Sequence, residues 1–550
     1  MIRDDLRSAL LEALAAAGLP VPESGVVVEP PRNPEHGDWS TNVALQLAKR
    51  VGSPPLEVAG RIRDALAAAG VAHVAAVDVA PPGFVNITLA PTWLGALLRE
   101  FVVAGDAFGR SSALAGRRIN LEFVSANPTG PLHAGGGRWV AVGDAIANLL
   151  AARGAEVHRE YYLNDAGNQL RTFRDSLHAR YRGEEPPEGG YQGEYLVEMA
   201  SRLRAELGDD VDPDVACEWG YREIVAGLRD DLGRIGVEFD TWFSERVLHE
   251  RGDVAAVLGI LDGAGRTYDH EGARWLRSSD FGDPRDRVLV RSDGSTTYLC
   301  NDLAYHRDKF ARGFDHLIDI WGADHHGQVK SLQAGLEALG FPAGEPEVLL
   351  GQFVRIVKGD TEVKISKRAG TIVTVADLLD EVDPDVARMT FLLQGIESPM
   401  TFDLEAVASR SMDNPVYYVQ YAHARVMSIA RRAAAEGVIR RPLDGVDLAP
   451  LVHEREVELL RALAVYPDVV AEAADLRAPQ KISTWVRDFA RAFHGFYRDV
   501  RVLTDDDAAT QARLWLVEAC RIGLAAALGL LGVRAPDEMS RLDDDDSDAP

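Results

Sequence analysis

Two short segments, far apart along the chain, carry residue types suited to binding a nucleoside triphosphate. The first, Phe123 to Arg138, reads Phe-Val-Ser-Ala-Asn-Pro-Thr-Gly-Pro-Leu-His-Ala-Gly-Gly-Gly-Arg. It runs from an apolar strand through a turn rich in Pro and Gly into a helix that is predicted to begin near His133. Such a turn directs backbone N–H groups and a helix N-terminus at one point, which suits a phosphate group.

The second segment, Val363 to Arg368, reads Val-Lys-Ile-Ser-Lys-Arg. Lys364 and Lys367 flank Ser366 on a predicted loop, where they could hold the far end of a triphosphate. The chain has only seven lysines among its 59 basic residues, and three of them, Lys358, Lys364 and Lys367, fall within ten residues. In a chain that otherwise uses arginine, this cluster indicates that compact point charges are needed here.

The bulk composition predicts a large multidomain protein of the cytoplasm. A length of 550 residues allows several hydrophobic cores, and the hydrophobic and charged fractions of 46% and 26% are ordinary for a globular protein. No apolar run approaches the ~20 residues that cross a bilayer, and the N-terminus lacks the apolar core of a signal peptide. Cys217, Cys300 and Cys520 are isolated, which argues against a disulfide framework or a structural zinc site. We expect no membrane contact and no metal centre.

The formal net charge of −26 argues by itself against a nucleic-acid partner. Binding of a polyanion would therefore depend on local basic surface and should weaken as salt is added. The acidic run from Asp543 to Asp548 is most simply a solvated end of the chain.

Hydrophobic periodicity indicates which elements position the two segments. We predict an apolar strand at Ile119–Val124, a helix at Gly136–Gly154 and a second strand at Val157–Leu163. Further strands are predicted at Tyr298–Leu299, His316–Trp321 and Phe353–Val357. Strands that alternate with helices favour a parallel sheet covered on both faces. The stretch 170–290 is richer in charge and helix, which indicates an insertion.

The two ends of the chain have different patterns. Residues 1 to about 88 indicate a small α/β unit, whereas the pattern beyond about 405 is almost wholly helical and predicts a bundle. The elements predicted in the first unit are helices at Leu6–Ala17, after Ser40 and at Pro55–Ala69, and strands at Val26–Pro30, 73–80 and 84–89.

Five further blocks accompany the two segments: Glu35–Ala44, Tyr161–Gln169, Gly190–Leu196, Gly322–His326 and Asn414–Arg425. In this order, the seven blocks resemble class I aminoacyl-tRNA synthetases, and among these the arginyl-tRNA synthetase family of the bacterial type. The resemblance covers nearly the whole chain except the acidic tail. A Gly-rich turn alone is weak evidence, but seven blocks in register are strong.

The resemblance implies an α/β fold with three main parts. These are a Rossmann-like parallel-sheet catalytic domain, a small α/β N-terminal domain and an all-α C-terminal bundle. The resemblance also implies where the chain divides into domains. These are an additional N-terminal domain for the tRNA elbow (1–90), the catalytic domain (91–375, with a helical insertion at about 170–290), a connector (376–410), an anticodon-binding domain (411–538) and an acidic tail (539–550).

For ATP, the resemblance implies preorganised donors that stabilise charge building on the phosphate oxygens. His133 and Gly135 match the first histidine and the glycine of the family's His-x-Gly-His signature, but Gly136 stands where the second histidine would be. One possible phosphate donor is therefore missing. His133, the helix N-terminus and the lysines of the second segment would carry the charge between them.

The second segment matches the family's mobile signature loop, which holds the β- and γ-phosphates. Its matching residues are Lys364, Ser366 and Lys367, and Lys367 is the better candidate to contact phosphate in the transition state. Together with His133, the two lysines are the candidate catalytic residues. Asp324 matches an acidic residue near the ATP ribose.

For arginine, the matching residues are Glu122, Asn127, Tyr298, Asp302 and one of His325 and His326, with His325 preferred. A planar guanidinium needs carboxylates in a pocket poor in water. Two carboxylates aimed at one cation would discriminate against a neutral analogue by roughly 2–5 kcal/mol. Without the resemblance, Glu122 reads as an edge-strand carboxylate, Asp302 as a helix cap or surface pair, and the histidines as core residues.

For tRNA, the resemblance implies contacts in the C-terminal bundle and around Asn33 to Asn42. The bundle carries the arginines Arg425, Arg431, Arg432, Arg440, Arg441, Arg487, Arg491, Arg498 and Arg501. Aromatics accompany them: Tyr417, Tyr418, Tyr421, Trp485, Phe493 and Tyr497. A solvated helix face is the default reading of such arginines, and most of these aromatics are expected in the core. Single-stranded bases stack on exposed aromatic or arginine planes at about 1–3 kcal/mol per base.

The function implied is that of an arginine–tRNA ligase. ATP, accompanied by Mg²⁺ as counter-charge, and L-arginine would form arginyl-adenylate, and the arginyl group would pass to the terminal ribose of tRNA(Arg). We expect a monomer that needs bound tRNA before it activates arginine. Two alternatives remain: a nucleotidyltransferase for a small carboxylate, which would not need the bundle, and a non-catalytic tRNA-binding paralogue, suggested by Gly136.

Overall fold

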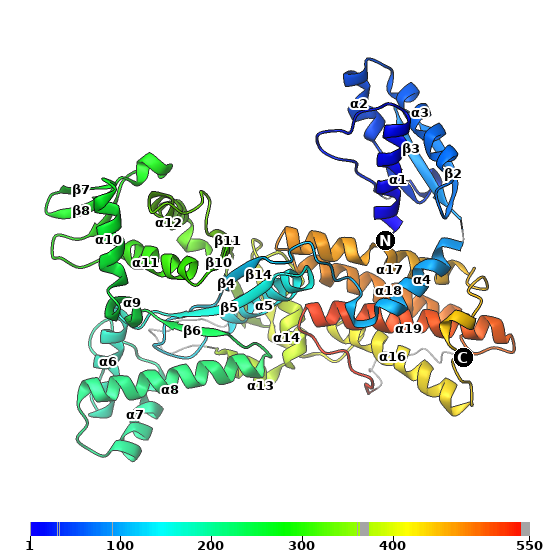
Figure 1. The fold of residues 1–550 in the computed structure, drawn as a ribbon. Coiled ribbons are helices and arrows are strands. Elements are labelled where there is room, and N and C mark those ends of the chain that lie inside the picture. The colour runs from blue at the N-terminus through cyan, green and yellow to red at the C-terminus, as the bar shows by residue number, and fades with distance from the viewer. Residues whose placement is uncertain are drawn as a thin grey trace.

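The centre of the molecule is a five-stranded parallel sheet in the order β11-β10-β4-β5-β6 (Figure 1). The computed structural model describes residues 2–29, 31, 33–90, 92–359, 361–362 and 373–540. The strands of this sheet are β4 (Arg118–Glu122), β5 (Glu156–Leu163), β6 (Thr241–Ser244), β10 (His316–Gly322) and β11 (Glu347–Gly351). The predicted parallel sheet is confirmed, and β4 lies in its middle.

Helices cover both faces of this sheet. On one face, Phe123 packs against α5 (Gly137–Ala152), where a Cβ added to Gly143 would lie 2.3 Å from the Phe123 ring. The absence of a side chain at Gly143 thus lets the helix approach the strand closely. On the other face lies α11 (Tyr298–Ala311), beside α12 (His326–Ala338). The polar end of β4, at Glu122, is bonded to α11.

The insertion predicted for 170–290 is not continuous. Its helices are α6 (Asn168–Tyr181), α7 (Glu194–Leu207), α8 (Pro213–Arg234), α9 (Arg246–Glu250) and α10 (Asp253–Gly263). Between α8 and α9, however, β6 returns to the edge of the central sheet. A separate antiparallel sheet follows, made of β7 (Thr267–His270), β8 (Ala273–Leu276) and β9 (Arg287–Val290). Strands of four residues are too short to give a periodic signal among charged helices.

The strand predicted at Tyr298–Leu299 is wrong, because these residues form the first turn of α11. Thr297 caps this helix, and its Oγ1 accepts a hydrogen bond from the Cys300 backbone N–H at 3.4 Å. Periodicity alone cannot assign a short apolar run to a strand or to a helix, and here the capping residue Thr297 favours the helix.

The strand predicted at Phe353–Val357 forms as β12 (Val354–Lys358), but outside the central sheet. It pairs with β13 (Thr361–Glu362) and β14 (Met400–Asp403) in a small sheet of its own. The helices that follow are α13 (Val375–Glu381), α14 (Pro384–Phe391) and α15 (Leu404–Ala408). Residues 363–372, which include the second lysine-rich segment, lie outside the described residues.

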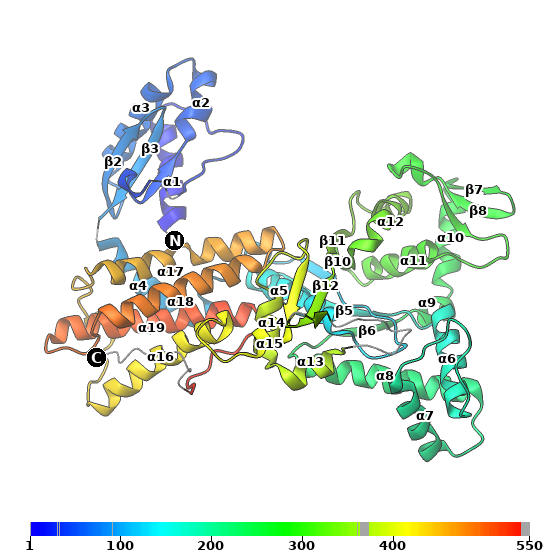
Figure 2. The same ribbon diagram turned by 180° about the vertical axis from the view of Figure 1, so that it is seen from behind.

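The N-terminal unit is a three-stranded antiparallel sheet covered by helices, and it projects from the helical C-terminal region (Figures 1 and 2). Ion pairs between Asp38 and Arg461 and between Arg3 and Asp468 join it to that region. Its elements are α1 (Ile2–Ala16), β1 (Trp39–Thr41), α2 (Val43–Val51), α3 (Pro55–Ala69), β2 (Val74–Ala80) and β3 (Phe84–Leu89). The strand predicted at Val26–Pro30 does not form over its described residues, 26–29, among which only Glu29 pairs, in a single bridge to Ser40. Val26 and Val28 are buried, so their alternation reflects core packing of an irregular segment.

The C-terminal region is the predicted helical bundle, with α4 packed against it (Figures 1 and 2). Its helices are α4 (Thr92–Ala104), α16 (Pro415–Ala435), α17 (Glu454–Asp475), α18 (Gln480–Asp499) and α19 (Asp507–Leu530). Short 3-10 turns connect elements throughout: η1 (Pro34–His36), η2 (Gly105–Ala107), η3 (Ala134–Gly136), η4 (Ser278–Phe281), η5 (Ala323–His325) and η6 (Leu443–Gly445). Across the described part of the chain, no helix has the length and apolar character needed to span a membrane.

Candidate active site

The first segment lies at the carboxyl edge of the central sheet, between β4 and α5. His133 caps the turn η3, and its Nδ1 accepts a hydrogen bond from the Gly135 backbone N–H at 2.8 Å. An Nδ1 that accepts a hydrogen bond carries no proton, so in the neutral ring the proton is on Nε2. The imidazole is therefore oriented as a donor through Nε2.

The turn at His133 is bonded to the chain just beyond the second segment. Ala134 N–H donates to the Val373 carbonyl at 2.8 Å, and Val375 N–H donates to the Leu132 carbonyl at 2.8 Å. His133 also forms an isolated bridge with Thr374. The segment containing Lys364, Ser366 and Lys367 lies outside the described residues, and the described chain that follows it, from Val373, is bonded to the glycine-rich turn.

Gly135 and Gly136 are buried within this turn. A Cβ on Gly135 would lie 2.9 Å from His133 Nδ1, which would disrupt the orientation of the ring. A Cβ on Gly136 would lie 2.9 Å from Leu132 Cδ1, so any side chain here, a histidine included, requires Leu132 to move. Glycine, which replaces the second histidine of the signature at position 136, therefore fits beside Leu132 without any movement of that side chain.

The turn after β4 has a strained backbone. Val124 and Ser125 have φ of 71° and 41°, in a region that non-glycine residues rarely adopt and that costs about 1–3 kcal/mol each. Ser125 Oγ donates to Glu122 Oε1 at 2.9 Å and accepts from Tyr162 N–H at 3.1 Å. The Tyr161 hydroxyl bonds both the N–H and the carbonyl of Ala126 at 3.1 Å. These bonds hold the strained turn in place.

Carboxylates gather beside this turn. Glu122, Asp302 and Glu245 all interact electrostatically with the Tyr162 hydroxyl and, together with burial, raise its pKa well above the usual value. Burial raises the pKa of Asp302 to about 7; Glu122 and Glu245 add to this rise, whereas nearby His306 opposes it. Burial also raises the pKa of Glu245, although Asn301 and Tyr162 bond to it. The site therefore has an excess of negative charge that a cationic ligand would relieve.

Glu245 was missed in the sequence because β6 was not recognised. It follows Ser244, the last residue of β6, and is only 3% exposed. Its Oε1 accepts a hydrogen bond from Asn301 Nδ2 at 2.7 Å, which ties it to the α11 turn that carries Asp302. An acidic residue directly after a strand, at the carboxyl edge of a parallel sheet, would have been the signal.

Glu122 and Asp302 do not have the purely structural roles that were the alternatives to arginine binding. Glu122 is not on an edge strand, because β4 has a partner on either side. It accepts hydrogen bonds from Ser125 Oγ and, at 2.6 Å, from Lys309 Nζ. Asp302 is not the cap of α11, a role taken by Thr297, and it lies half-buried among acidic residues.

The remaining predicted residues lie at the rim of this site. Tyr298 begins α11 with 55% of its surface exposed, and Asn127 is half-buried in the strained turn. Asp324 and His325 follow β10, and both side chains are exposed, with His325 Nε2 3.6 Å from Asp324 Oδ2. The core alternative for His325 and His326 is wrong, since both are exposed.

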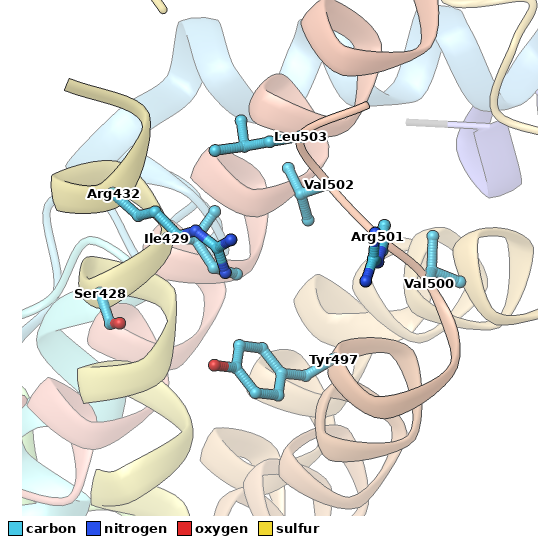
Figure 3. Close-up of a pocket in the computed structure, with 8 residues that line it drawn as sticks. All are labelled: Ser428, Ile429, Arg432, Tyr497, Val500, Arg501, Val502 and Leu503. Carbon is cyan, nitrogen blue, oxygen red and sulfur yellow. The ribbon is translucent and has the colours of Figure 1, made fainter. Parts of the chain in front are cut away.

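A second candidate surface lies on the bundle, between α16 and the end of α18 (Figure 3). A cavity of about 120 Å³ is lined by Ser428, Ile429, Arg432, Tyr497, Val500, Arg501, Val502 and Leu503. The Arg425 guanidinium lies over the rings of Tyr421 and Tyr497, at 4.6 and 4.9 Å from their centroids.

The aromatics of the bundle divide into two groups. Trp485 and Phe493 are buried, as expected for most of them. The tyrosines Tyr417, Tyr418, Tyr421 and Tyr497 are only partly buried, and all but Tyr421 pack against the same hydrophobic core, so most of the aromatics belong to the core or its border, as predicted. Their phenol groups can reach solvent from helices whose apolar faces form the bundle core.

A third candidate surface is a hollow in the N-terminal unit, beside β1 and β3. It has a volume of about 640 Å³ and is lined by Val27, Glu29, Pro31, Asn33, His36, Ser40, Asn42, Ala80, Pro81, Phe84 and Asn86. Phe84 is 36% exposed, and the Asn86 side chain is oriented by a 2.8 Å hydrogen bond from Ser40 Oγ. The predicted contact region, Asn33 to Asn42, therefore borders a hollow with an aromatic and an amide side chain.

Among the residues that the structure describes, no group of three or more His, Cys, Asp or Glu side chains is arranged to hold a metal ion. The carboxylates near Tyr162 are bonded to Asn301, Ser125 and Lys309.

Three family models match the chain. The arginyl tRNA synthetase N terminal domain matches residues 4–89, the class I (R) tRNA synthetase catalytic domain 206–393, and the DALR anticodon binding domain 419–539. The chain is 46% identical to an arginine–tRNA ligase of Kineococcus radiotolerans, over 97% of this chain and 98% of the relative.

Solved structures of arginyl-tRNA synthetases also match the chain. A putative arginyl-tRNA synthetase from Campylobacter jejuni is 32% identical, with a TM-score of 0.74, over 82% of this chain and 100% of that one. The arginyl-tRNA synthetase of Thermus thermophilus, 22% identical with a TM-score of 0.77, shares the fold over 98% of this chain and 100% of its own. The chain thus belongs to the arginyl-tRNA synthetase family, and its activity is that of an ATP-dependent arginine–tRNA ligase with tRNA and arginine as partners.

Proposed function

We propose that L-arginine binds at the carboxyl edge of the central sheet, with its guanidinium among Asp302, Glu245 and Glu122. The observation that carries this proposal is the meeting of these three carboxylates, since Glu245 is bonded to Asn301 beside Asp302, and Glu122 and Glu245 both act on Asp302. Burial first, and then these neighbouring carboxylates, raise the pKa of Asp302 to about 7. A bound guanidinium would offset this repulsion and donate hydrogen bonds to the carboxylates in a planar, bidentate arrangement. Tyr298 and Asn127 would complete the rim.

ATP would bind beside this pocket, over the glycine-rich turn. His133 would donate through Nε2 to a phosphate oxygen, because Nδ1 is occupied by the Gly135 N–H. Gly135 and Gly136 would leave room for the nucleotide against the backbone. Asp324 and His325, exposed at the end of β10, would lie near the ribose and the reacting carboxylate. Lys364, Ser366 and Lys367 would hold the β- and γ-phosphates.

The reaction would then proceed in two steps. A carboxylate oxygen of arginine attacks the α-phosphorus, the bond to the bridging oxygen of the β-phosphate breaks, and pyrophosphate leaves. The terminal ribose hydroxyl of tRNA(Arg) next attacks the carbonyl carbon of the adenylate, and AMP leaves. Preorganised donors such as His133 and the lysines act where charge develops, and each is worth roughly 2.7–4 kcal/mol by analogy with oxyanion-hole deletions. Mg²⁺ would enter with ATP as its counter-charge.

Each domain of the chain would have its own part in this reaction. Residues 91–375 would carry the chemistry, and 376–410 would connect them to the anticodon-binding bundle at 411–538. The cavity beside Tyr497, with Arg432 and Arg501 at its border, would receive an anticodon base. Residues 1–90 would contact the tRNA elbow through the hollow bordered by Phe84 and Asn86. Residues 539–550 would be an acidic tail.

We propose further that the chain acts as a monomer in the cytoplasm and activates arginine only when tRNA is bound. Its three cysteines are free and buried, which suits a reducing compartment. Light scattering of the purified protein tests the monomer. Pyrophosphate exchange, measured with and without tRNA, tests the requirement for tRNA.

The central test is the charging of total bacterial tRNA with radiolabelled arginine. We expect robust charging by the wild type and a fall of about 100-fold or more in kcat for His133→Ala and Lys367→Ala, from the loss of one phosphate donor each. Matched controls are His270→Ala, in the exposed antiparallel sheet, and Lys481→Ala, on α18.

Wild-type charging by both controls would assign the losses to the active site. Unchanged charging by His133→Ala would contradict the proposed phosphate contact. Tight tRNA binding by the wild type without charging would contradict the catalytic assignment as a whole.

A further inference from the structure

Three neighbouring strands of the central sheet carry an acidic residue at the same level. In register, Asp319 of β10 pairs with Glu122 of β4, which pairs with Glu160 of β5. Paired residues of neighbouring strands point to the same face of a sheet. Asp319 and Glu160 are 0% exposed and Glu122 is 8% exposed. We call these three residues the acid row.

Helix α11 places a cation against each part of the acid row. His306 Nε2 lies 2.7 Å from Asp319 Oδ2, and Arg312 contacts both oxygens of Glu160 at 2.6 and 2.7 Å. His306, Lys309 and Arg312, the residue that directly follows α11, are spaced three residues apart and therefore lie along one face of the helix. The register of α11 on the sheet is therefore set by charge as well as by apolar packing.

Lys309 occupies the middle of this arrangement. Its Nζ lies 2.6 Å from Glu122 Oε2 and 3.0 Å from Asp319 Oδ1, and 4.4 Å from the centroid of the Tyr305 ring. The side chain is 0% exposed, in a chain with only seven lysines. A compact ammonium fits between two adjacent strands, where a planar guanidinium would need more room.

Two connections lead from Lys309 to the proposed arginine pocket. Through Glu122 it reaches Ser125, whose hydroxyl donates to the other oxygen of the same carboxylate, and thus the strained turn. Along α11 it reaches Asp302, whose carbonyl accepts a hydrogen bond from His306 Nδ1 at 2.7 Å. Lys309 itself is buried beneath the pocket and is not one of the residues assigned to arginine.

We propose that Lys309 is a positioning residue for arginine recognition, which holds Glu122 and the first turns of α11 so that Glu122 and Asp302 face the same guanidinium. This inference rests on the proposed arginine pocket. It goes beyond that pocket by giving a specificity role to a residue that does not touch the substrate. The plain alternative is an ion pair that only stabilises the fold, since breaking a buried pair is costly wherever it lies.

The test compares Lys309→Met with the double variant Lys309→Met/Asp319→Asn in the full-length protein. Lys309→Met leaves two buried carboxylates without their ammonium. We expect its KM for arginine to rise about 30-fold or more, the usual result of truncating one partner of a buried charge pair. The KM values for ATP and tRNA should change less than about twofold, because their contacts lie elsewhere.

The double variant separates positioning from stability. It removes one of the two carboxylates that lost the ammonium, so its thermal midpoint should recover part of the way toward the wild-type value, while Glu122 still lacks its ammonium. A KM for arginine that stays raised after this recovery supports the positioning role. A KM that returns to normal with stability would overturn it. Should the single variant fail to fold, the double variant carries the test alone.

A matched control and one independent variant complete the design. Arg287→Met breaks a comparable pair with the buried Asp283, at 2.8 Å, in the antiparallel sheet, and should lower stability without raising the KM for arginine. An equal rise in this control would also overturn the role of Lys309. Asp302→Asn tests the pocket itself: an unchanged KM for arginine there would refute the proposed pocket, independently of the result at Lys309.

Discussion

The proposed arginine pocket and the bundle cavity would both face charged ligands, but their own charges are placed differently. In the pocket, Glu245 is buried and Asp302 is half-buried, and burial raises the pKa values of both. In the cavity, Arg432 and Arg501 are exposed at the surface of the bundle, beside the partly buried Tyr497 (Figure 3). Buried charges interact strongly and are screened little, whereas exposed charges are weakened by salt. The pocket is suited to selecting one small cation, and the cavity to capturing one part of a large polyanion.

The largest expected effect is that of Asp302→Asn. The variant keeps the shape of the side chain but removes a charge that would face the guanidinium. We expect the KM for arginine to rise about 30-fold or more, with little dependence on salt. Steady-state charging at low and high salt measures both quantities. Asp293→Asn, in an exposed turn, is the control, and an Asp302→Asn effect that vanished at high salt would place the charge at the surface.

Tyr497→Ala should produce the next largest effect. It removes the ring that borders the cavity and supports Arg425. We expect the KM for tRNA to rise by about 5–30-fold, in the lower part of the range for the loss of one stacked base, with the KM for arginine unchanged. Tyr268→Ala, in the antiparallel sheet, serves as the aromatic control. Equal changes in both KM values would mean that the two regions are not independent.

The pH dependence should differ between the two regions. Binding of a guanidinium requires the ionised form of Asp302, whose pKa of about 7 follows from burial and from Glu122, Glu245 and Asp319 nearby, against His306. The kcat/KM for arginine should therefore fall by about tenfold per pH unit below 7 and level off above it. The KM for tRNA should be nearly constant over this range. An identical acid limb in Asp302→Asn would assign the titration to another group.

The smallest effect is expected for Arg432→Gln. A single exposed arginine contributes a modest contact, so the KM for tRNA should rise only a few-fold, and the salt slope should fall by about 1. A titration of charging rate against salt concentration measures the slope. Arg202→Gln, an exposed arginine on α7, provides the control. An unchanged slope would remove Arg432 from the phosphate contacts.

Much of this organisation could be predicted because it is local in the sequence. The α5 helix, the strands at 156–163 and 316–322, α3 and the long helices of the bundle follow from periodicity and from caps within a few residues. Short strands could not be predicted in the same way. β6 has four residues within a charged, helical region, and missing it meant missing Glu245.

The sequence by itself determined which residue types are available to bind a triphosphate and an amino acid, because the seven blocks and their order are read directly from the chain. Only the tertiary structure decided which charges are neutralised. Lys309 lies far from Glu122 and close to Asp319 in the sequence, yet the parallel pairing of β4 with β10 places both carboxylates within 3.0 Å of its ammonium. Electrostatic energy depends on distance and burial, and both are set by strand pairing between segments that no local pattern connects.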